Sequence, residues 1–236
     1  MRRMGIVFLT LVLAGGLLAG CGGSGGGKTS SSNGEASKPA AQVLTDATKA
    51  ATTASSFHVS GHITSSGTHV SLDLTIAKGK GAKGSMTASG ASFDLVAIGN
   101  TLYIKGSDAF YKQFGGAAAA QLLHGKWVKG SANSGQLAQL GMLTNTQVLF
   151  QQVTKNHGKL VNDGETTYAG QKVVGIKKAS NGDTIYVAAT GTPYPVALVG
   201  GTGSNKGNAV TFDRWNQSVS ISAPSGAIDI SQFTGG

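Results

Sequence analysis

The sequence predicts an α+β fold in which short helices lie on one face of an antiparallel β-sheet. Apolar and polar residues alternate with a period of two between Phe57 and Lys105, which is typical of strands with one buried face. The alternation stops between Ala109 and Thr154, where apolar residues and glycines form short helix-like groups, and it resumes after His157. Strands, then helices, then strands in one chain favour helices gathered on one face of the sheet.

The first 20 residues have the features of a bacterial signal peptide. Arg2 and Arg3 precede an apolar stretch from Ile6 to Leu18, which is too short to span a bilayer. Residues 18–21 read Leu-Ala-Gly-Cys, so small residues stand directly before the only cysteine of the chain. This pattern predicts a lipoprotein signal that is cleaved between Gly20 and Cys21.

Cys21 is the predicted site of lipidation. Its thiol would carry a diacylglyceryl group and its new amino group a further chain such as palmitate, and each buried methylene adds about 0.8 kcal/mol to membrane attachment. The protein is therefore predicted to be located on the extracytoplasmic side of a bacterial cell membrane, to which the lipid anchors it. The alternative is a plain secretory signal in which a cysteine occupies this place by coincidence.

The chain after the cleavage point divides into a tether and one folded domain. Residues 21–38 are mainly Gly, Ser and Thr, a composition typical of a flexible coil. We therefore predict a signal peptide over 1–20, a tether over 21–38 and a single domain over 39–236. A chain without a second cysteine forms no internal disulfide, so a hydrophobic core must stabilise this domain.

The mature chain is basic. Without the signal peptide, Lys+Arg falls from 19 to 17 against 10 acidic residues, which leaves a net charge of +7. The lysines are scattered and no aromatic residues are interleaved with them, so anionic headgroups or cell-wall polymers are favoured over nucleic acid as partners. A generally basic, solvated surface is the alternative.

The folded elements of the first half follow from periodicity. A helix is predicted from Pro39 because apolar residues recur at helical spacing, at Val43, Leu44, Ala47, Ala50, Ala51 and Ala54. Period-two alternation with Gly-rich turns then predicts a meander of strands. These strands are Phe57–Ile63, Val70–Ile76, Gly84–Ser89, Phe93–Ile98 and Thr101–Lys105.

The second half is predicted in the same way. Short helical pieces at residues 110–114, 117–123, 137–143 and 148–153 surround an isolated strand at Lys126–Lys129. Strands follow at Lys159–Asp163, Glu165–Lys178, Asp183–Ala189, Pro195–Gly200, Asn208–Trp215 and Val219–Ser222, with a turn at Gly164 between the first two.

The predicted lipoprotein signal, the tether and the opening helix are followed by a series of short segments in a fixed order. These segments are Tyr103–Lys105, Gly125–Val128, Val173–Gly175, Ile185–Ala188, Thr190–Val196 and Thr211–Asn216. In this order they resemble the LppX/LprAFG-type lipoproteins of the LolA-like superfamily of lipid and lipoprotein carriers. The resemblance covers nearly the whole mature chain. Trp215 and Asn216 match a Trp-Asn pair of the family, and we interpret them as structural, with a ring anchoring a strand end and an asparagine at a turn.

The resemblance implies a half-barrel, a strongly curved antiparallel sheet whose concave side is closed by helices around an apolar cavity. It also implies that the chain binds a lipid or a lipidated molecule such as a glycolipid, and that a transporter or an acceptor lipoprotein is a partner. Candidate cavity residues alternate with polar neighbours and so share a buried face. They are Leu72, Leu74, Ile76, Phe93, Leu95, Leu102, Ile104, Ile185, Val187 and Val210. Ordinary core packing is the alternative for each of them.

The sequence gives no indication of catalysis, of a cofactor or of a bound metal. The run Gly79–Gly84 satisfies G-x-G-x-x-G, but a strand follows it where a dinucleotide site needs a helix. His58 and His62 are too far apart along a strand to share a metal easily. No G-x-S-x-G or H-E-x-x-H motif occurs, and the single cysteine is assigned to acylation.

Two classes of function remain. In the first, the protein is a membrane-anchored carrier that holds a lipid in its cavity and transports it within the cell envelope. In the second, it is an envelope interaction or sensor module with the same fold and no usable cavity. A lipid retained through purification favours the carrier.

Overall fold

The computed structural model describes residues 31–65, 67–133, 137–142, 146–147, 150 and 157–230. The helices are α1 (Ala40–Thr53), α2 (Asp108–Leu123) and α3 (Leu137–Met142), with short 3₁₀ helices η1 (Glu35–Ser37) and η2 (Gly203–Asn205). The strands are β1 (Ser56–Ser65), β2 (Thr68–Ala77), β3 (Gly81–Ala88), β4 (Ala91–Ile98), β5 (Thr101–Gly106), β6 (Val128–Ser131), β7 (Leu160–Tyr168), β8 (Gln171–Lys178), β9 (Thr184–Ala188), β10 (Pro195–Val199), β11 (Ala209–Asp213) and β12 (Ile228–Asp229).

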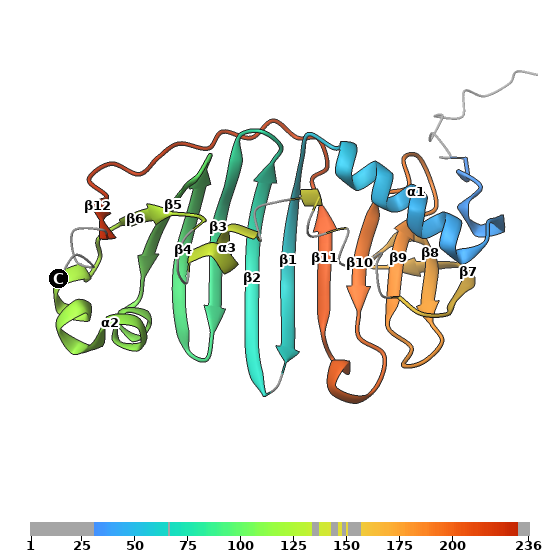
Figure 1. Ribbon diagram of the computed structural model, residues 1–236. Coiled ribbons are helices and arrows are strands. Elements are labelled where there is room, and N and C mark those ends of the chain that lie inside the picture. The colour runs from blue at the N-terminus through green and yellow to red at the C-terminus, as the bar shows by residue number, and fades with distance from the viewer. Residues whose placement is uncertain are drawn as a thin grey trace, which may run out of the picture.

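The twelve strands of the described residues form one open sheet (Figure 1). Their order is β12-β6-β5-β4-β3-β2-β1-β11-β10-β9-β8-β7, so each half of the chain contributes a meander and the two meanders join where β1 pairs with β11. Every pairing is antiparallel except that of β12 with β6. The predicted meander of the first half is therefore confirmed, and the second half extends it from β1 outward.

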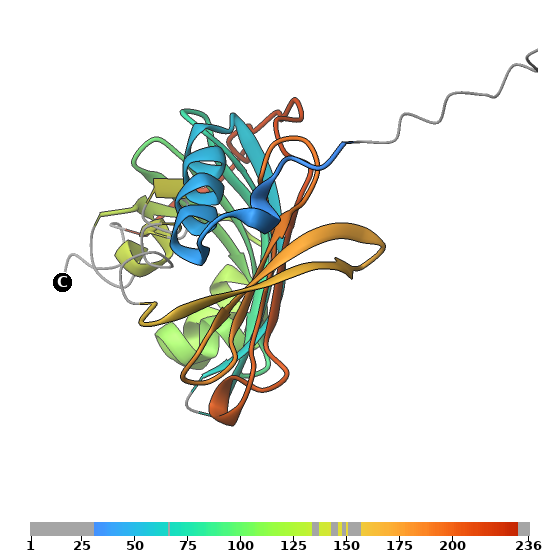
Figure 2. The same cartoon turned by 90° about the vertical axis from the view of Figure 1, so that its right-hand side faces the viewer.

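The helices lie on one face of the sheet (Figure 2). Helix α1 contacts β7, β8 and β10, while α2 contacts β4 and β5. We call this side the helix-covered face and the opposite side the open face. The predicted α+β class, with helices gathered on one face of a curved antiparallel sheet, is confirmed.

Strand register explains which residues reach the helix-covered face. Phe57 pairs with Ile76 and Val59 with Leu74, and all four side chains are buried. Their neighbours His58 and Ser60 point to the open face because successive side chains of a strand alternate between faces. The period-two pattern of the sequence is thus the pattern of the two faces.

Helix α1 begins directly after Pro39, as predicted. Its buried residues, Val43 and Ala47 among them, pack against Val174, Ile176 and Val187 of β8 and β9. Small alanines on this stripe allow the helix to lie close to the strands. The apolar spacing in the sequence is therefore the contact surface of the helix.

The predicted turn at Gly164 is wrong. β7 continues through Gly164 with a register shift between Asn162 and Glu165, and the chain turns at Ala169 and Gly170 instead. Those two residues have φ of 47° and 80°, the positive values that a two-residue hairpin turn requires. Gly164, at φ 81°, accommodates the bulge.

Two predicted strands also differ from the structure. Residues Val219–Ser222 form no strand, and this part of the chain passes along the ends of the strands, from β11 back towards β12 (Figure 1). The ends of strands do not present the row of backbone N–H and C=O groups that a further strand needs for pairing. The apolar–polar alternation of residues 219–222 therefore means that one side of this segment rests on the rim of the sheet. The strand predicted at Lys126–Lys129 is β6, and it is paired with β5 and β12 rather than isolated.

Residues 32–38, which the composition assigns to the tether, contact the sheet. Ser32 forms an isolated bridge with Thr190, and the Asn33 side-chain amide donates hydrogen bonds to the carbonyls of Ala188 and Gly191. Glu35 is buried and its Oε1 lies 2.7 Å from Lys38 Nζ. The fold therefore begins before Pro39. The hydrogen bonds of the Asn33 side chain attach this segment to the sheet, and a composition rich in Gly and Ser does not reveal them.

Acid should weaken the connection between the β8–β9 turn and the loop after β10. Asp183 Oδ1 accepts a hydrogen bond from Gly201 N, and Oδ2 accepts from the side chains of Asn181 and Asn205. Burial alone raises the pKa of the Asp183 carboxyl, but these hydrogen bonds outweigh it and hold the pKa below its usual 3.8. The stabilisation is thus present above the unfolded-state pKa and is lost as the pH falls through the lower, folded-state value.

We expect Asp183→Asn to reduce the free energy of unfolding at pH 7, and the difference from the wild type to shrink as the pH falls below about 4. Urea unfolding at a series of pH values measures this. Asp94→Asn, at an exposed carboxylate on β4, is the control and should leave the pH profile unchanged. An Asp183→Asn profile parallel to that of the wild type would contradict the assignment.

Candidate functional site

The helix-covered face is the candidate lipid site predicted from the sequence. Eight of the ten predicted cavity residues belong to one apolar cluster under α2 and α3 or pack against it: Leu72, Leu74, Ile76, Phe93, Leu95, Leu102, Ile104 and Val210. Ile185 and Val187 belong to a second cluster under α1. The structure therefore brings the ten residues to one face but divides them between two clusters.

Protein atoms cover most of this face. The exposed fraction is 0 % for Leu95 and Leu102 and 2 % for Ile104, and α2 contributes Phe110, Ala120 and Leu123 to the same cluster. Phe150 also belongs to it and lies edge-on to Phe57, with the ring centroids 5.6 Å apart. Among the described residues, the centre of the helix-covered face is thus a packed core.

Helix α2 is anchored firmly at its N-terminal end. Ser107 caps it by accepting a hydrogen bond from Phe110 N. The buried Tyr111 hydroxyl accepts a hydrogen bond from Gly106 N and lies 3.0 Å from the carbonyl oxygen of Lys126, to which it can donate. Burial raises the pKa of Tyr111, so the hydroxyl stays protonated at neutral pH.

The second part of α2 is attached less firmly. Gly116 interrupts the helix at φ 76° and ψ −173°, so the segment 117–123 is a separate helical piece. Its buried contacts are Ala120 and Leu123, whereas Leu122 is 49 % exposed. The break at Gly116 therefore divides α2 into an N-terminal half that is anchored to the sheet and a C-terminal half with few buried side chains.

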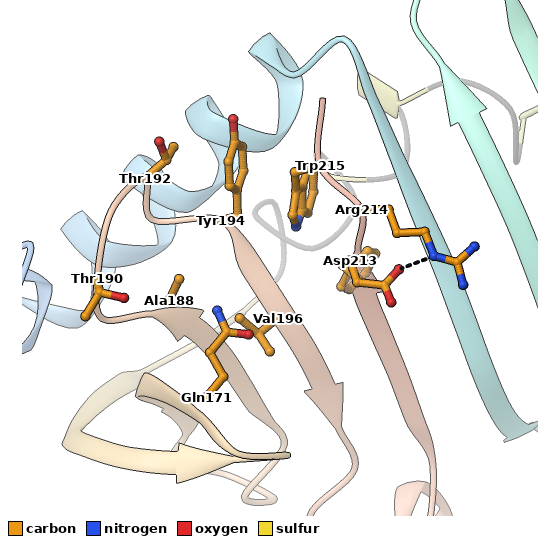
Figure 3. Close-up of a pocket in the computed structure, with 10 residues that line it drawn as sticks. Gln171, Ala188, Thr190, Thr192, Tyr194, Val196, Asp213, Arg214 and Trp215 are labelled. Atoms are coloured by element: carbon orange, nitrogen blue, oxygen red, sulfur yellow. Dashed lines mark ion pairs between the residues drawn. The ribbon is translucent and has the colours of Figure 1, made fainter. Parts of the chain in front are cut away.

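A pocket lies on the open face, at the ends of β9, β10 and β11 (Figure 3). Its volume is about 340 Å³, and its lining residues are Gln171, Ala188, Thr190, Thr192, Tyr194, Val196, Phe212, Asp213, Arg214 and Trp215. Ala188 and Val196 belong to a third apolar cluster, separate from the cluster under α1. None of the ten predicted cavity residues lines this pocket.

Aromatic rings form one wall of the pocket. Tyr194 and Trp215 are stacked with ring centroids 4.5 Å apart and an interplanar angle of 6°. Phe57 stacks on Trp215 at 5.1 Å and joins this wall to the core. Trp215 therefore touches both the packed core and the pocket.

Backbone strain and one asparagine fix the position of Trp215. The flanking residues Arg214 and Asn216 have φ of 51° and 59°, which are uncommon for residues other than glycine. Asn216 Oδ1 accepts a hydrogen bond from Ser55 N, and its Nδ2 donates to the Tyr194 hydroxyl. These contacts agree with the structural interpretation of Trp215 and Asn216, and they also place both rings in the pocket wall.

Asp213 connects the pocket to a buried histidine on the open face. Its Oδ1 lies 2.6 Å from His58 Nδ1 and 3.9 Å from Arg214 Nε, while His58 Nε2 lies 3.0 Å from Asp73 Oδ1. Within the described residues, no group of three or more His, Cys, Asp or Glu side chains is arranged to hold a metal.

The sequence prediction missed the pocket, because its lining residues come from strand ends and turns rather than from one periodic pattern. The available signal is the resemblance of Thr190–Val196 and Thr211–Asn216 to segments of the LppX/LprAFG-type lipoproteins, and this resemblance by itself indicates no pocket. Gly20 and Cys21 lie outside the described residues. In the described ranges, no helix has both the length and the apolar character needed to cross a bilayer.

No protein-family model and no curated protein matches the chain. Among solved structures, LprF from Mycobacterium bovis is similar with a TM-score of 0.52 at 17% identity, and the match covers 79% of this chain and 97% of that one. An uncharacterised conserved protein from Thermus thermophilus matches with a TM-score of 0.40 at 10% identity, covering 80% and 96% of the two chains.

The MucA/MucB complex of Pseudomonas aeruginosa matches with a TM-score of 0.34 at 13% identity, covering 79% of this chain and 59% of that one. These last two scores are too low to support an argument. The likeness to LprF establishes the fold, and it agrees with the fold implied by the resemblance to LppX/LprAFG-type lipoproteins. The chain therefore adopts the same curved-sheet fold as LprF.

Proposed function

We propose that this protein is a membrane-anchored lipoprotein that binds a lipid or lipidated molecule on the helix-covered face and carries it within the cell envelope. The observation that carries the proposal is the LprF-like fold together with an apolar cluster that extends over β1–β6 on one face. Acylated Cys21 would anchor the chain, and residues 22–31 would serve as the tether.

Binding on this face requires part of the helical cover to move. The half of α2 after Gly116 is the element best suited to this, because among the described residues its members of the cluster are Ala120 and Leu123. An acyl chain that replaces this half of α2 keeps the apolar strand residues covered. The favourable free energy of binding therefore comes from the apolar surface of the lipid itself. It is about 25 cal/mol for each Å² removed from water.

Native mass spectrometry of the chain from residue 27 onward, followed by organic extraction, tests the proposal. We expect a lipid bound in stoichiometric amount. Leu72→Asp should abolish retention because it places a charge on the helix-covered face, whereas Ser71→Asp places the same charge on the open face and should retain the lipid. Circular dichroism confirms that both variants are folded, and Leu72→Gln replaces the aspartate variant if that one unfolds.

The second candidate is an envelope interaction or sensor module without a usable cavity. The packing of Leu95, Leu102 and Ile104 favours it, because protein atoms already cover these side chains. If the native mass of the wild-type chain shows no bound lipid and the chain takes up no fluorescent fatty acid, the carrier function is contradicted and the interaction or sensor module is supported.

A further inference from the structure

We propose that the pocket at the ends of β9–β11 is a second site, separate from the lipid face, and that it binds a neutral sugar ring. The pocket is on the open face, while the apolar cluster of the proposed lipid site is on the helix-covered face. The two regions meet at Phe212 and Trp215, which line the pocket and also pack against that cluster. None of the ten residues that we assign to the lipid site lines the pocket, so sugar binding can be tested on a chain that holds no lipid.

The size of the pocket suits a small ligand. Its volume of about 340 Å³ is at the lower end of the range of about 300–1,000 Å³ that is usual for ligand sites. One or two pyranose rings are of this size. A folded polymer or a whole lipid is too large for it.

The aromatic wall favours a ring with an apolar face. Trp215 is held between Tyr194 and Phe57, and Asn216 fixes both the end of β11 and the Tyr194 hydroxyl. A wall that is already rigid loses little conformational entropy when a ligand binds. Both faces of Trp215 are covered, so the wall offers a ligand the edge of this ring and the Tyr194 face opposite Trp215. Pyranose rings present C–H groups on their faces and hydroxyls on their edges, and the C–H groups suit this apolar surface.

The remaining lining groups suit the hydroxyls. Among the described residues, the side-chain amide of Gln171 and the hydroxyls of Thr190 and Thr192 make no hydrogen bond with the protein. Figure 3 shows Gln171 directed from β8 towards the aromatic rings, with Thr190 and Thr192 on the loop between β9 and β10. Amide and hydroxyl groups both donate and accept, as the hydroxyls of a sugar do.

The charges of the pocket favour a neutral ligand over an ion. Asp213 and Arg214 are the two charged residues of the lining, and Asp213 Oδ1 lies 3.9 Å from Arg214 Nε. Their charges compensate each other, and His58 holds Asp213 from the other side. A phosphate or a free carboxylate would be repelled by the carboxylate of Asp213, which lies beside the guanidinium of Arg214.

Saturation-transfer NMR on the full chain in lauryldimethylamine oxide, a detergent without sugar, tests the proposal. The probes are the methyl glycosides of glucose, mannose and galactose. We expect transfer to the ring protons of at least one probe. Gln171→Ala and Thr190→Val should each weaken its binding by about tenfold, the effect of losing one hydrogen bond.

Gln217→Ala is the matched control, because Gln217 is an exposed glutamine outside the pocket. It should bind like the wild type, and so should Leu72→Asp, which acts only on the lipid face. Retention of sugar binding by a chain that holds no lipid would separate this proposal from the lipid proposal. Absence of transfer to all three probes, or transfer that survives both pocket variants, would overturn it.

Two sources could supply the ring: the headgroup of a glycolipid or a soluble envelope polysaccharide. Competition against the bound methyl glycoside distinguishes them. Displacement by glucosyl diacylglycerol in the micelles identifies the headgroup, and displacement by a dextran oligosaccharide identifies the polysaccharide. Either result supports recognition of the ring.

Discussion

Replacing Gly84 with alanine is expected to lower the free energy of unfolding by about 3 kcal/mol or more. Gly84 is in the middle of β3, paired with Leu74 and Leu95, and its φ is 155°. A Cβ on this residue would overlap the carbonyl oxygen of Asp73 and lie 2.8 Å from Leu74 Cα. Both atoms belong to the backbone of β2, so relief requires β2 and β3 to separate.

Urea unfolding followed by far-UV circular dichroism measures the effect. Gly90→Ala is the matched control, because Gly90 has a φ of 77° but no atom within 4 Å of the added Cβ. That variant should cost about 1 kcal/mol, the cost of the left-handed conformation alone. Equal losses in the two variants would show that the contact with β2 is not the cause.

Replacing Phe57 with alanine is expected to cost about 3–5 kcal/mol. Phe57 is 2 % exposed, and its ring meets Trp215 and Phe150 with centroid distances of 5.1 and 5.6 Å. The deletion would leave a cavity between Phe150, the sheet and the pocket wall at Trp215. Phe57→Leu retains most of the volume and should cost less than about 1.5 kcal/mol.

The same variant pair reports on the coupling between the core and the pocket wall. Because Phe57 supports one face of Trp215, we expect Phe57→Ala to change the near-UV circular dichroism of the folded protein more than Phe57→Leu does. Chemical denaturation supplies the stabilities, and the near-UV spectrum supplies the ring environment. An alanine variant as stable as the leucine variant would contradict the packing described here.

The two proposed sites differ in chemistry because the two faces of the sheet differ. Alternation along β1 and β11 sends Phe57 and Phe212 into the core and sends His58 and Asp213 to the open face. The apolar side suits a lipid, and the polar side suits a ligand with hydroxyl groups. Trp215, just after β11, is the residue that contacts both regions.

Local patterns predicted most strands and the opening helix because a half-buried strand or helix must repeat its apolar residues with its own period. The bulge at Gly164 and the turn at Ala169 could not be predicted in this way. Each of Gly164 and Gly170 is followed by a polar residue in the sequence, and only the pairing of β7 with β8 selects Ala169 and Gly170 for the turn. Composition assigns residues 32–38 to the tether, because the contacts that attach them to the sheet are made by side-chain amides and leave no apolar pattern in the sequence.

Local sequence patterns are sufficient to predict the α+β class, the alternation that defines the two faces and the acylation site at Cys21. These features depend on neighbours along the chain. Three features follow only from long-range contacts: β1 pairs with β11, the predicted cavity residues divide between two clusters, and Thr190, Gln171 and Trp215 share a pocket. Such long-range pairings depend on strand register and on competition for sheet edges, and neither leaves a periodic trace in the sequence.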